Sequence, residues 1–319
     1  MIKTAECVTP GHPDKLCDII SDAILDACLE QDPDTRAAIE TMGGHGIVNI
    51  CGEVTTTAYV DIPTIVKEIC DRFNEHVGVQ VNIVKQSPEI AQGVDTGGAG
   101  DQGIMTGYAC NDNEEYVPQE YYLARKLAQQ IYKSYPYDGK TQVTIDGSEL
   151  RVVASFQHAP KVALEEITKT FFSKFPQYTL EALHCNPAGD WAIGGFEADA
   201  GLTGRKLAVD NYGPRVPIGG GAFSGKDSSK VDRSAAYMAR RLAVDLLKAN
   251  DAKEVFVQLA YAIGYDQPLQ ATAVIDGVEK PITGIDLSPN GIIKFLDLKK
   301  PVFSQTAEWG HMGNNFNWK

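Results

Sequence analysis

Apolar residues recur at helical spacing near the start of the chain. From Leu16 to Cys28 they occupy the i, i+3, i+4 and i+7 positions of an amphipathic helix, and Pro13 suits its first turn. The same spacing predicts further helices over about 62–75, 119–134, 160–174 and 229–249.

Strand-like segments come mostly in adjacent pairs. The first pair covers Arg36 to Thr41 and Ile47 to Val60, and we expect its hairpin turn at Gly43-Gly44. Further strands are expected over about 79–85, 141–155, 179–186, 205–210, 254–262 and 270–276. Pairs of strands followed by a helix favour an α+β fold over a doubly wound parallel sheet. This unit occurs about three times, with rough breaks near 110 and 225 and no sequence identity between copies.

Composition and charge narrow the class of protein. At 319 residues, 43% of them hydrophobic, the chain can bury a sizeable core. Its net charge of −13 argues against broad binding to nucleic acid or to an anionic membrane, so any anion site must be a local basic pocket. Seven cysteines without a C-x-x-C pair indicate neither a disulfide framework nor a zinc ribbon. The sequence shows no leader and no membrane-spanning apolar run, which predicts a cytoplasmic protein.

Two short motifs combine polar residues with glycine. GHPDK places His12 and Asp14 at the start of the first helix, where free N–H groups attract anions. His12 could contact a phosphate while Asp14 holds a cation; the alternative is helix capping by Asp14 beside a surface His12. In GLTGRKLAVD, Arg205 and Lys206 precede a short apolar strand and suit a polyphosphate, unless they are a solvated pair of charges.

Two longer glycine-rich stretches are also open to either a functional or a structural interpretation. Residues 86–103, which end in Asp101-Gln102-Gly103, fit either a lid over a substrate pocket or a solvated surface loop. The loop GGGAFSGKD resembles a P-loop, but Asp227 stands where a serine or threonine would hold Mg²⁺. Lys226, Lys230 and Asp232 offer phosphate and Mg²⁺ ligands without a P-loop strand, and a surface turn before a capped helix is the alternative. No motif supports catalysis by a serine or cysteine nucleophile.

Taken together, GHPDK, GAGDQG, GLTGRK, GGGAFSGKD with SKVDRSAAY, and YAIG closely resemble the S-adenosylmethionine synthetases, also called methionine adenosyltransferases. The motifs lie in the same order from residue 6 to residue 318. The resemblance implies three similar α+β domains with pseudo-threefold symmetry, which we place at about 1–110, 111–225 and 226–319 with interleaving in sequence. It also implies a homodimer, or a homotetramer, with active sites between two subunits.

The reaction implied by the resemblance joins ATP and L-methionine. The thioether sulfur attacks C5′ of the ribose and displaces triphosphate, which the enzyme hydrolyses to diphosphate and phosphate. A neutral sulfur is already nucleophilic, so positioning and stabilisation of the leaving charge must supply most of the catalysis. The implied cofactors are Mg²⁺, two per site, and K⁺, one per site.

The resemblance assigns roles to particular residues. The catalytic residues would be His12, Lys140, Arg205, Lys206, Lys226 and Lys230. ATP would also contact Asp138, Asp190, Trp191, Asp199 and the backbone at Ala222. Methionine would be placed by Glu53, Gln86, Asp101, Asp199 and Lys230. Asp14 and Asp232 would hold Mg²⁺, and Glu40 would hold K⁺. The chain departs from the family at Asp190, where relatives commonly carry a basic residue, and in a shorter 86–103 loop.

Two other functions are open to the same residues. A kinase or ATPase would transfer only the terminal phosphoryl group and release ADP. A non-catalytic nucleotide-binding subunit would be expected to lack at least one of His12, Asp14, Lys226 and Asp232, and this chain has all four.

Overall fold

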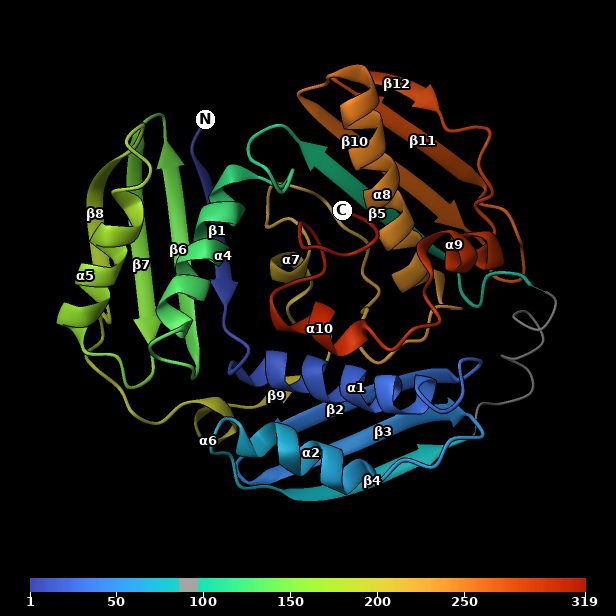
Figure 1. Cartoon of the computed structure of the whole chain (residues 1–319), viewed down its shortest axis with the longest axis horizontal. Coiled ribbons are helices and arrows are strands. Elements are labelled where there is room, and N and C mark those ends of the chain that lie inside the picture. The colour runs from blue at the N-terminus through green and yellow to red at the C-terminus, as the bar shows by residue number, and fades with distance from the viewer. Residues whose placement is uncertain (86–96) are drawn as a thin grey trace.

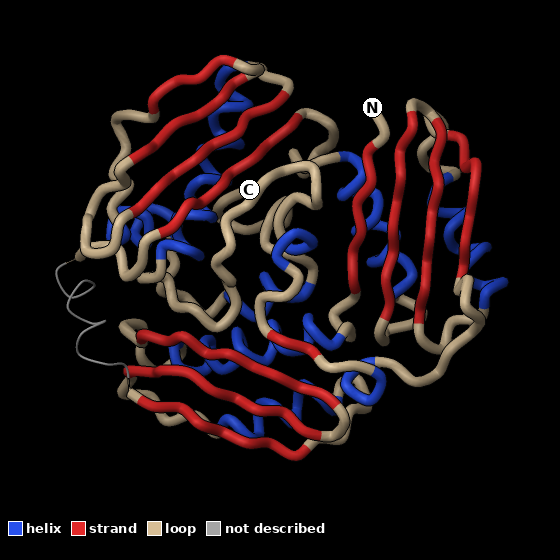
Figure 2. The backbone as a smooth tube through the Cα atoms, turned by 180° about the vertical axis from the view of Figure 1, so that it is seen from behind, coloured by secondary structure: helices blue, strands red, loops and turns tan. Residues whose placement is uncertain are grey.

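The computed structural model describes residues 1–85 and 97–319. Three four-stranded sheets lie around a common centre, and helices cover one face of each sheet (Figure 1). Seen from behind, the strands lie in front of the helices, so the open faces of the three sheets point to the same side of the molecule (Figure 2). This arrangement of three similar units confirms the predicted α+β fold.

Two of the sheets share one plan. The first has the order β4-β3-β2-β9, with β2 (Arg36–Gly44), β3 (Ile47–Thr55), β4 (Gly78–Val84) and β9 (Gly201–Leu202), and carries α1 (Pro13–Leu29) and α2 (Ile62–Asp71). The second has the order β1-β6-β7-β8, with β1 (Lys3–Val8), β6 (Gly139–Asp146), β7 (Glu149–Phe156) and β8 (Thr179–Cys185), and carries α4 (Gln119–Tyr132) and α5 (Lys161–Phe172). In both, a hairpin leads through a helix to a parallel edge strand.

The third sheet is antiparallel throughout. Its order is β12-β11-β10-β5, with β5 (Gly103–Cys110), β10 (Glu254–Tyr261), β11 (Gln270–Ile275) and β12 (Val278–Pro281), beside α8 (Val231–Asn250) and α9 (Pro289–Leu296). The short helices α6 (Gly195–Ala198), α7 (Leu207–Asp210) and α10 (Phe303–Glu308) connect the three units. Three strands, β1, β5 and β9, pair with strands that are distant in the sequence.

The C-terminal segment lies at the centre of the molecule (Figure 1). Trp318 is buried, stacks on Tyr237 with ring centroids 3.9 Å apart, and donates its indole N–H to the carbonyl oxygen of His311. All seven cysteines are free thiols. Among the helices of residues 1–85 and 97–319, none is long and apolar enough to cross a membrane.

Several predicted element limits are wrong. The first hairpin turns at His45-Gly46, where φ is 50° and 81°, and not at Gly43-Gly44. A two-residue turn of this kind needs positive φ at both central positions, whereas Gly43 lies inside β2 against the ring of Phe196. The strand β3 ends at Thr55 and not at Val60. The apolar run expected as a strand over 205–210 forms the helical turn α7.

Candidate active site

The first turn of α1 brings His12 to the end of a helix. His12 is the N-cap residue, and its Nδ1 accepts the backbone N–H of Asp14 at 3.1 Å, which leaves the ring proton on Nε2. Burial, with the positive charge of Lys206, lowers the pKa of His12 to about 4. His12 is therefore neutral at pH 7 and can donate one hydrogen bond. A Cβ at Gly11 would lie 2.7 Å from the carbonyl carbon of Tyr137, so glycine allows the helix to approach β6 closely.

Asp14 forms ion pairs with both basic residues of the 201–206 segment, Arg205 and Lys206. Its carboxylate pairs with Lys206 Nζ at 2.5 Å and with Arg205 Nε at 3.3 Å, and it accepts the backbone N–H of Leu202 at 3.0 Å. Burial alone would raise the pKa of Asp14, but the hydrogen bonds from Lys206 and Leu202 outweigh it and hold the pKa below its ordinary value. Residues 192 apart thus form one charged group. We call His12, Asp14, Arg205 and Lys206 the histidine cluster.

Asp138 and Lys140 lie at the start of β6, beside the histidine cluster. Asp138 Oδ2 accepts the backbone N–H of Gly195 at 3.1 Å, and burial raises the pKa of Asp138 to about 6. The charge of Lys140 contributes to the lowered pKa of His12, and Lys140 also pairs with Glu6 at 2.8 Å across the β1–β6 pair. The structure therefore brings these two predicted ATP contacts to the same place as His12.

The loop after β8 carries two more predicted ATP contacts. The Trp191 indole N–H donates to Asn186 Oδ1 at 3.4 Å, and the ring is half-buried. Asp190 Oδ1 accepts the N–H of Lys161 and an amide hydrogen of Asn186, both at 3.0 Å. Asp190 Oδ1 therefore already accepts two hydrogen bonds, one of them from the first residue of α5. Asp199 is exposed, and its negative charge contributes to the raised pKa of Asp138.

A second charged group lies at the start of α8. Lys226 Nζ pairs with Asp232 Oδ2 at 2.6 Å, and Lys230 pairs with Asp227. Asp227 is buried and accepts the N–H of Ala37 on β2 at 2.7 Å. The carboxylate that breaks the P-loop pattern thus fastens the loop to a sheet. We call Lys226, Lys230, Asp227 and Asp232 the lysine cluster.

The remaining predicted residues lie on the first sheet and in the loops between elements. Glu40 and Glu53 lie on the same open face of the first sheet, since Glu53 is opposite Ala38 and Glu40 is two residues further along β2. Burial raises the pKa of Glu40, although the charge of Lys226 opposes this. Asp101 is exposed. Ala222 lies beside the histidine cluster, because a Cβ at Gly204 would come within 2.6 Å of its methyl group. Gln86 and residues 86–96 of the predicted 86–103 lid lie outside the described residues.

The two clusters remain separate networks in one chain. Lys206 turns toward Asp14, whereas Lys226 turns toward Asp232, and no ion pair in the described ranges joins one cluster to the other. Within residues 1–85 and 97–319 there is no group of three or more histidine, cysteine or acidic side chains arranged to hold a metal ion. Each cluster offers one carboxylate for a cation, Asp14 paired with Lys206 and Asp232 paired with Lys226.

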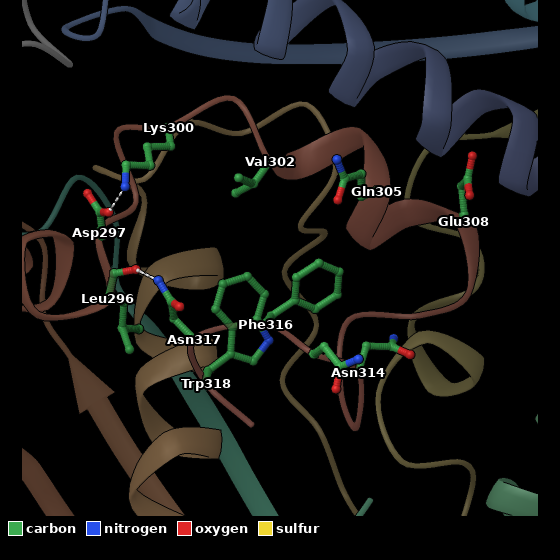
Figure 3. Close-up of a pocket in the computed structure, with 11 residues that line it drawn as sticks. Leu296, Asp297, Lys300, Val302, Gln305, Glu308, Asn314, Phe316, Asn317 and Trp318 are labelled. Carbon is green, nitrogen blue, oxygen red and sulfur yellow. Dashed lines mark hydrogen bonds and ion pairs between the residues drawn. The ribbon is translucent and has the colours of Figure 1, made fainter.

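A separate cavity of about 750 Å³ lies along the C-terminal segment (Figure 3). It is lined by residues from Leu296 to Trp318, including Gln305, Asn314 and Phe316. None of the predicted site residues is among them, so cavity size does not identify the site in this chain.

Comparison with known proteins decides the family. The models of the N-terminal, central and C-terminal domains of S-adenosylmethionine synthetase match residues 1–92, 96–191 and 193–319. The chain is 43% identical to the S-adenosylmethionine synthase of Clostridium tetani (strain Massachusetts / E88), over 97% of this chain and 93% of that protein. The chain belongs to the S-adenosylmethionine synthetase family. The synthetase makes S-adenosylmethionine from ATP and methionine, and the enzymes of the family depend on metal ions.

Sequence reasoning missed two buried aspartates of the synthetase. Asp18 accepts the backbone N–H of Gly204, and Asp22 accepts that of Gly225, each at 2.8 Å. Both glycines directly precede a predicted phosphate ligand. The signal was present in the sequence, because α1 carries aspartate at every fourth position from 14 to 26 along one helix face.

Proposed function

We propose that the histidine cluster and the lysine cluster bind the triphosphate of ATP together, each active site taking one cluster from each of two subunits. The observation that carries this proposal is the matched pairing of Asp14 with Lys206 and of Asp232 with Lys226. In each pair a carboxylate suited to Mg²⁺ holds a lysine suited to phosphate. A Mg²⁺-triphosphate would give both partners a new counter-charge, so neither would be left uncompensated.

The donor sets fit the proposed cations. Mg²⁺ is commonly held by one or two carboxylates plus substrate phosphates, which agrees with one carboxylate in each cluster. Bound there, Mg²⁺ would neutralise charge on the phosphates. We assign K⁺ to Glu40 on the open face of the first sheet.

The open sheet face supports the homodimer. Met42, Ile47, Val84 and Leu202 are exposed apolar residues that lie on the same face as Glu40 and Glu53. Several exposed apolar side chains on one open sheet face are consistent with an interaction surface. Burying it against a second copy would bring Glu40 and Glu53 to the interface, where we place methionine and K⁺. We further propose domain limits near 110 and 225 and a location in the cytoplasm.

The residues of the chain account for the first chemical step. Methionine sulfur needs no general base, so the site must orient it and stabilise the leaving triphosphate. Neutral His12 would donate its Nε2–H to an oxygen at the bond that breaks, while Arg205, Lys206, Lys226 and Lys230 would hold the phosphates.

The other assignments place the two substrates. Asp138, Lys140, Asp190, Trp191, Asp199 and the backbone at Ala222 would hold the rest of ATP. Glu53, Gln86, Asp101, Asp199 and Lys230 would orient methionine.

Product analysis tests the proposal directly. The purified protein is incubated with ATP, methionine, Mg²⁺ and K⁺, and the products are identified by chromatography and mass spectrometry. We expect S-adenosylmethionine with equimolar diphosphate and phosphate. ADP as the nucleotide product would contradict the assignment and favour a phosphoryl transferase.

Lysine variants test the two clusters separately. We expect Lys206→Met and Lys226→Met each to lower kcat by about 100-fold or more, because each removes a charge from the leaving group. Lys169→Met, at an exposed position on α5, is the matched control and should leave kcat unchanged. Normal turnover by either cluster variant would remove that cluster from the triphosphate site.

A further inference from the structure

Helix α1 carries four buried aspartates one turn apart, which we call the aspartate ladder. Each accepts backbone N–H groups from another segment: Asp14 from Leu202 at 3.0 Å, Asp18 from Gly204 and Asp22 from Gly225 at 2.8 Å, and Asp26 from Phe303 and Ser304 at 3.0 and 2.8 Å. The ladder therefore fastens three segments, remote in sequence, to one helix.

A contribution to folding stability does not by itself explain why these four buried positions are aspartates. A buried carboxylate loses its hydration, and apolar residues of similar size are often at least as stabilising at such positions. The charges of Asp18 and Asp22 are balanced by further buried charges, Lys15 and Arg233. A role that requires exact placement of the attached segments accounts for them better.

Asp22 fixes the peptide that precedes the side chain of Lys226. It accepts Gly225 N–H and also holds Arg233 through two contacts, at 2.6 and 2.8 Å. Arg233 in turn donates to the carbonyl oxygen of Lys226 at 3.0 Å. The loop is therefore hydrogen-bonded on both sides of Lys226, at the N–H of Gly225 and at the carbonyl of Lys226, by two groups that also pair with each other.

Asp18 fixes the peptide that precedes Arg205 and Lys206 of the histidine cluster. It accepts Gly204 N–H just before Arg205 and Lys206. Lys15 then bridges Asp18 at 3.2 Å and Asp210 at 2.7 Å, so the basic pair lies between two anchored points of the chain.

We propose that Asp18 and Asp22 are positioning residues that hold the two phosphate-binding loops one turn apart on α1. Four residues of α-helix span about 6 Å, so the helix fixes the offset between the two anchor points. The inference rests on the proposed function, because it takes Lys206 and Lys226 as triphosphate ligands. Anchoring both loops on one rigid element fixes where each subunit presents its two clusters to a partner.

Substitutions at Asp18 distinguish the effect of where its hydrogen-bond acceptor lies from the effect of its negative charge. Asp18→Asn keeps an acceptor in place for Gly204, whereas Asp18→Glu keeps the charge but moves it by one methylene. We expect kcat to fall by about 100-fold in Asp18→Glu and in Asp18→Ala, and by less than about tenfold in Asp18→Asn. Hydrolysis of added tripolyphosphate, which needs no methionine, should fall in parallel.

Asp26→Ala is the matched control. It removes the same kind of bond from the same helix face, but α10 carries neither cluster. We expect it to lower the melting temperature while kcat stays within about threefold of the wild type.

Two results would overturn the inference. One is a folded Asp18→Glu with normal kcat beside an inactive Asp18→Asn, which would show that charge and not position matters. The other is an equal loss of kcat in Asp26→Ala, which would show a general effect of destabilisation. If Lys206→Met and Lys226→Met are themselves fully active, the proposed function fails instead, whatever the Asp18 variants do.

Discussion

His12 combines a structural and a chemical task through its two ring nitrogens. Nδ1 caps α1, and Nε2 keeps the proton that we assign to the leaving group. Its lowered pKa depends on burial and on Lys206, which is far away in the sequence. A histidine at a helix start could be predicted from GHPDK, but its protonation state could not, because the charges that set it arrive only on folding.

The titration of His12 should appear in the pH dependence of stability. Because its pKa falls from 6.5 to about 4 on folding, the unfolded chain takes up a proton first as the pH drops below 6.5, and the folded state loses stability. His12→Asn keeps a capping acceptor without this titration. Between pH 7 and pH 5 the wild type should lose about 2 kcal/mol relative to the variant, measured by urea unfolding. An unchanged difference at the two pH values would contradict the neutral histidine.

Separate motifs can be recognised in the sequence, whereas the grouping of their side chains cannot. His12 with Asp14, and Arg205 with Lys206, were recognised as separate motifs, and the structure joins them in one cluster. Asp227 was noticed only as a broken P-loop pattern, since its partner Ala37 lies 190 residues earlier. Hydrogen bonds to distant backbone groups leave no local pattern.

Elements with a clear period were predicted to within a few residues. The helices α4, α5 and α8 and the strands β8 and β10 fall where the spacing of apolar residues placed them. The strands β1, β5, β9 and β12 were missed. The segment 205–210 was assigned to the wrong class, because a short apolar run reads equally as strand or helix.

The first hairpin gives a test at this scale. A Cβ at Gly43 would lie 2.4 Å from the ring of Phe196, so Gly43→Ala overfills the space between β2 and α6. We expect a loss of about 1–3 kcal/mol in the free energy of unfolding, measured by chemical denaturation. Gly220→Ala is the control, because a Cβ there meets nothing within 4 Å, and it should change stability by less than about 0.5 kcal/mol. Equal losses in both variants would contradict the steric explanation.

For the whole molecule, the proposed dimer makes a quantitative prediction. A site that takes the histidine cluster from one subunit and the lysine cluster from the other can be restored by mixing inactive variants. Lys206→Met and Lys226→Met, unfolded and refolded together, should regain about a quarter of wild-type activity, because half of the dimers are mixed and each has one intact site. Refolding each variant alone is the control. No recovery from a mixture shown to exchange subunits would place both clusters in one chain.

The repetition of three units was visible in the sequence as recurring strand pairs with a helix. The resemblance implied interleaving, but which strands pair between units was not visible, because β5 pairs with β10 across some 150 residues of chain. Periodicity reports the face of an element and says nothing about its distant partner.

That exchange constrains how the protein is made. During synthesis β5 leaves the ribosome long before β10, and at ordinary elongation rates it waits roughly ten seconds or more for a partner. A fragment ending at residue 92 lacks β9, and one covering 96–191 lacks β1 while carrying an unpaired β5. The three segments that match the family models are therefore poor independent folding units, and translation must pass Tyr261 before β5 can pair along its whole length with β10.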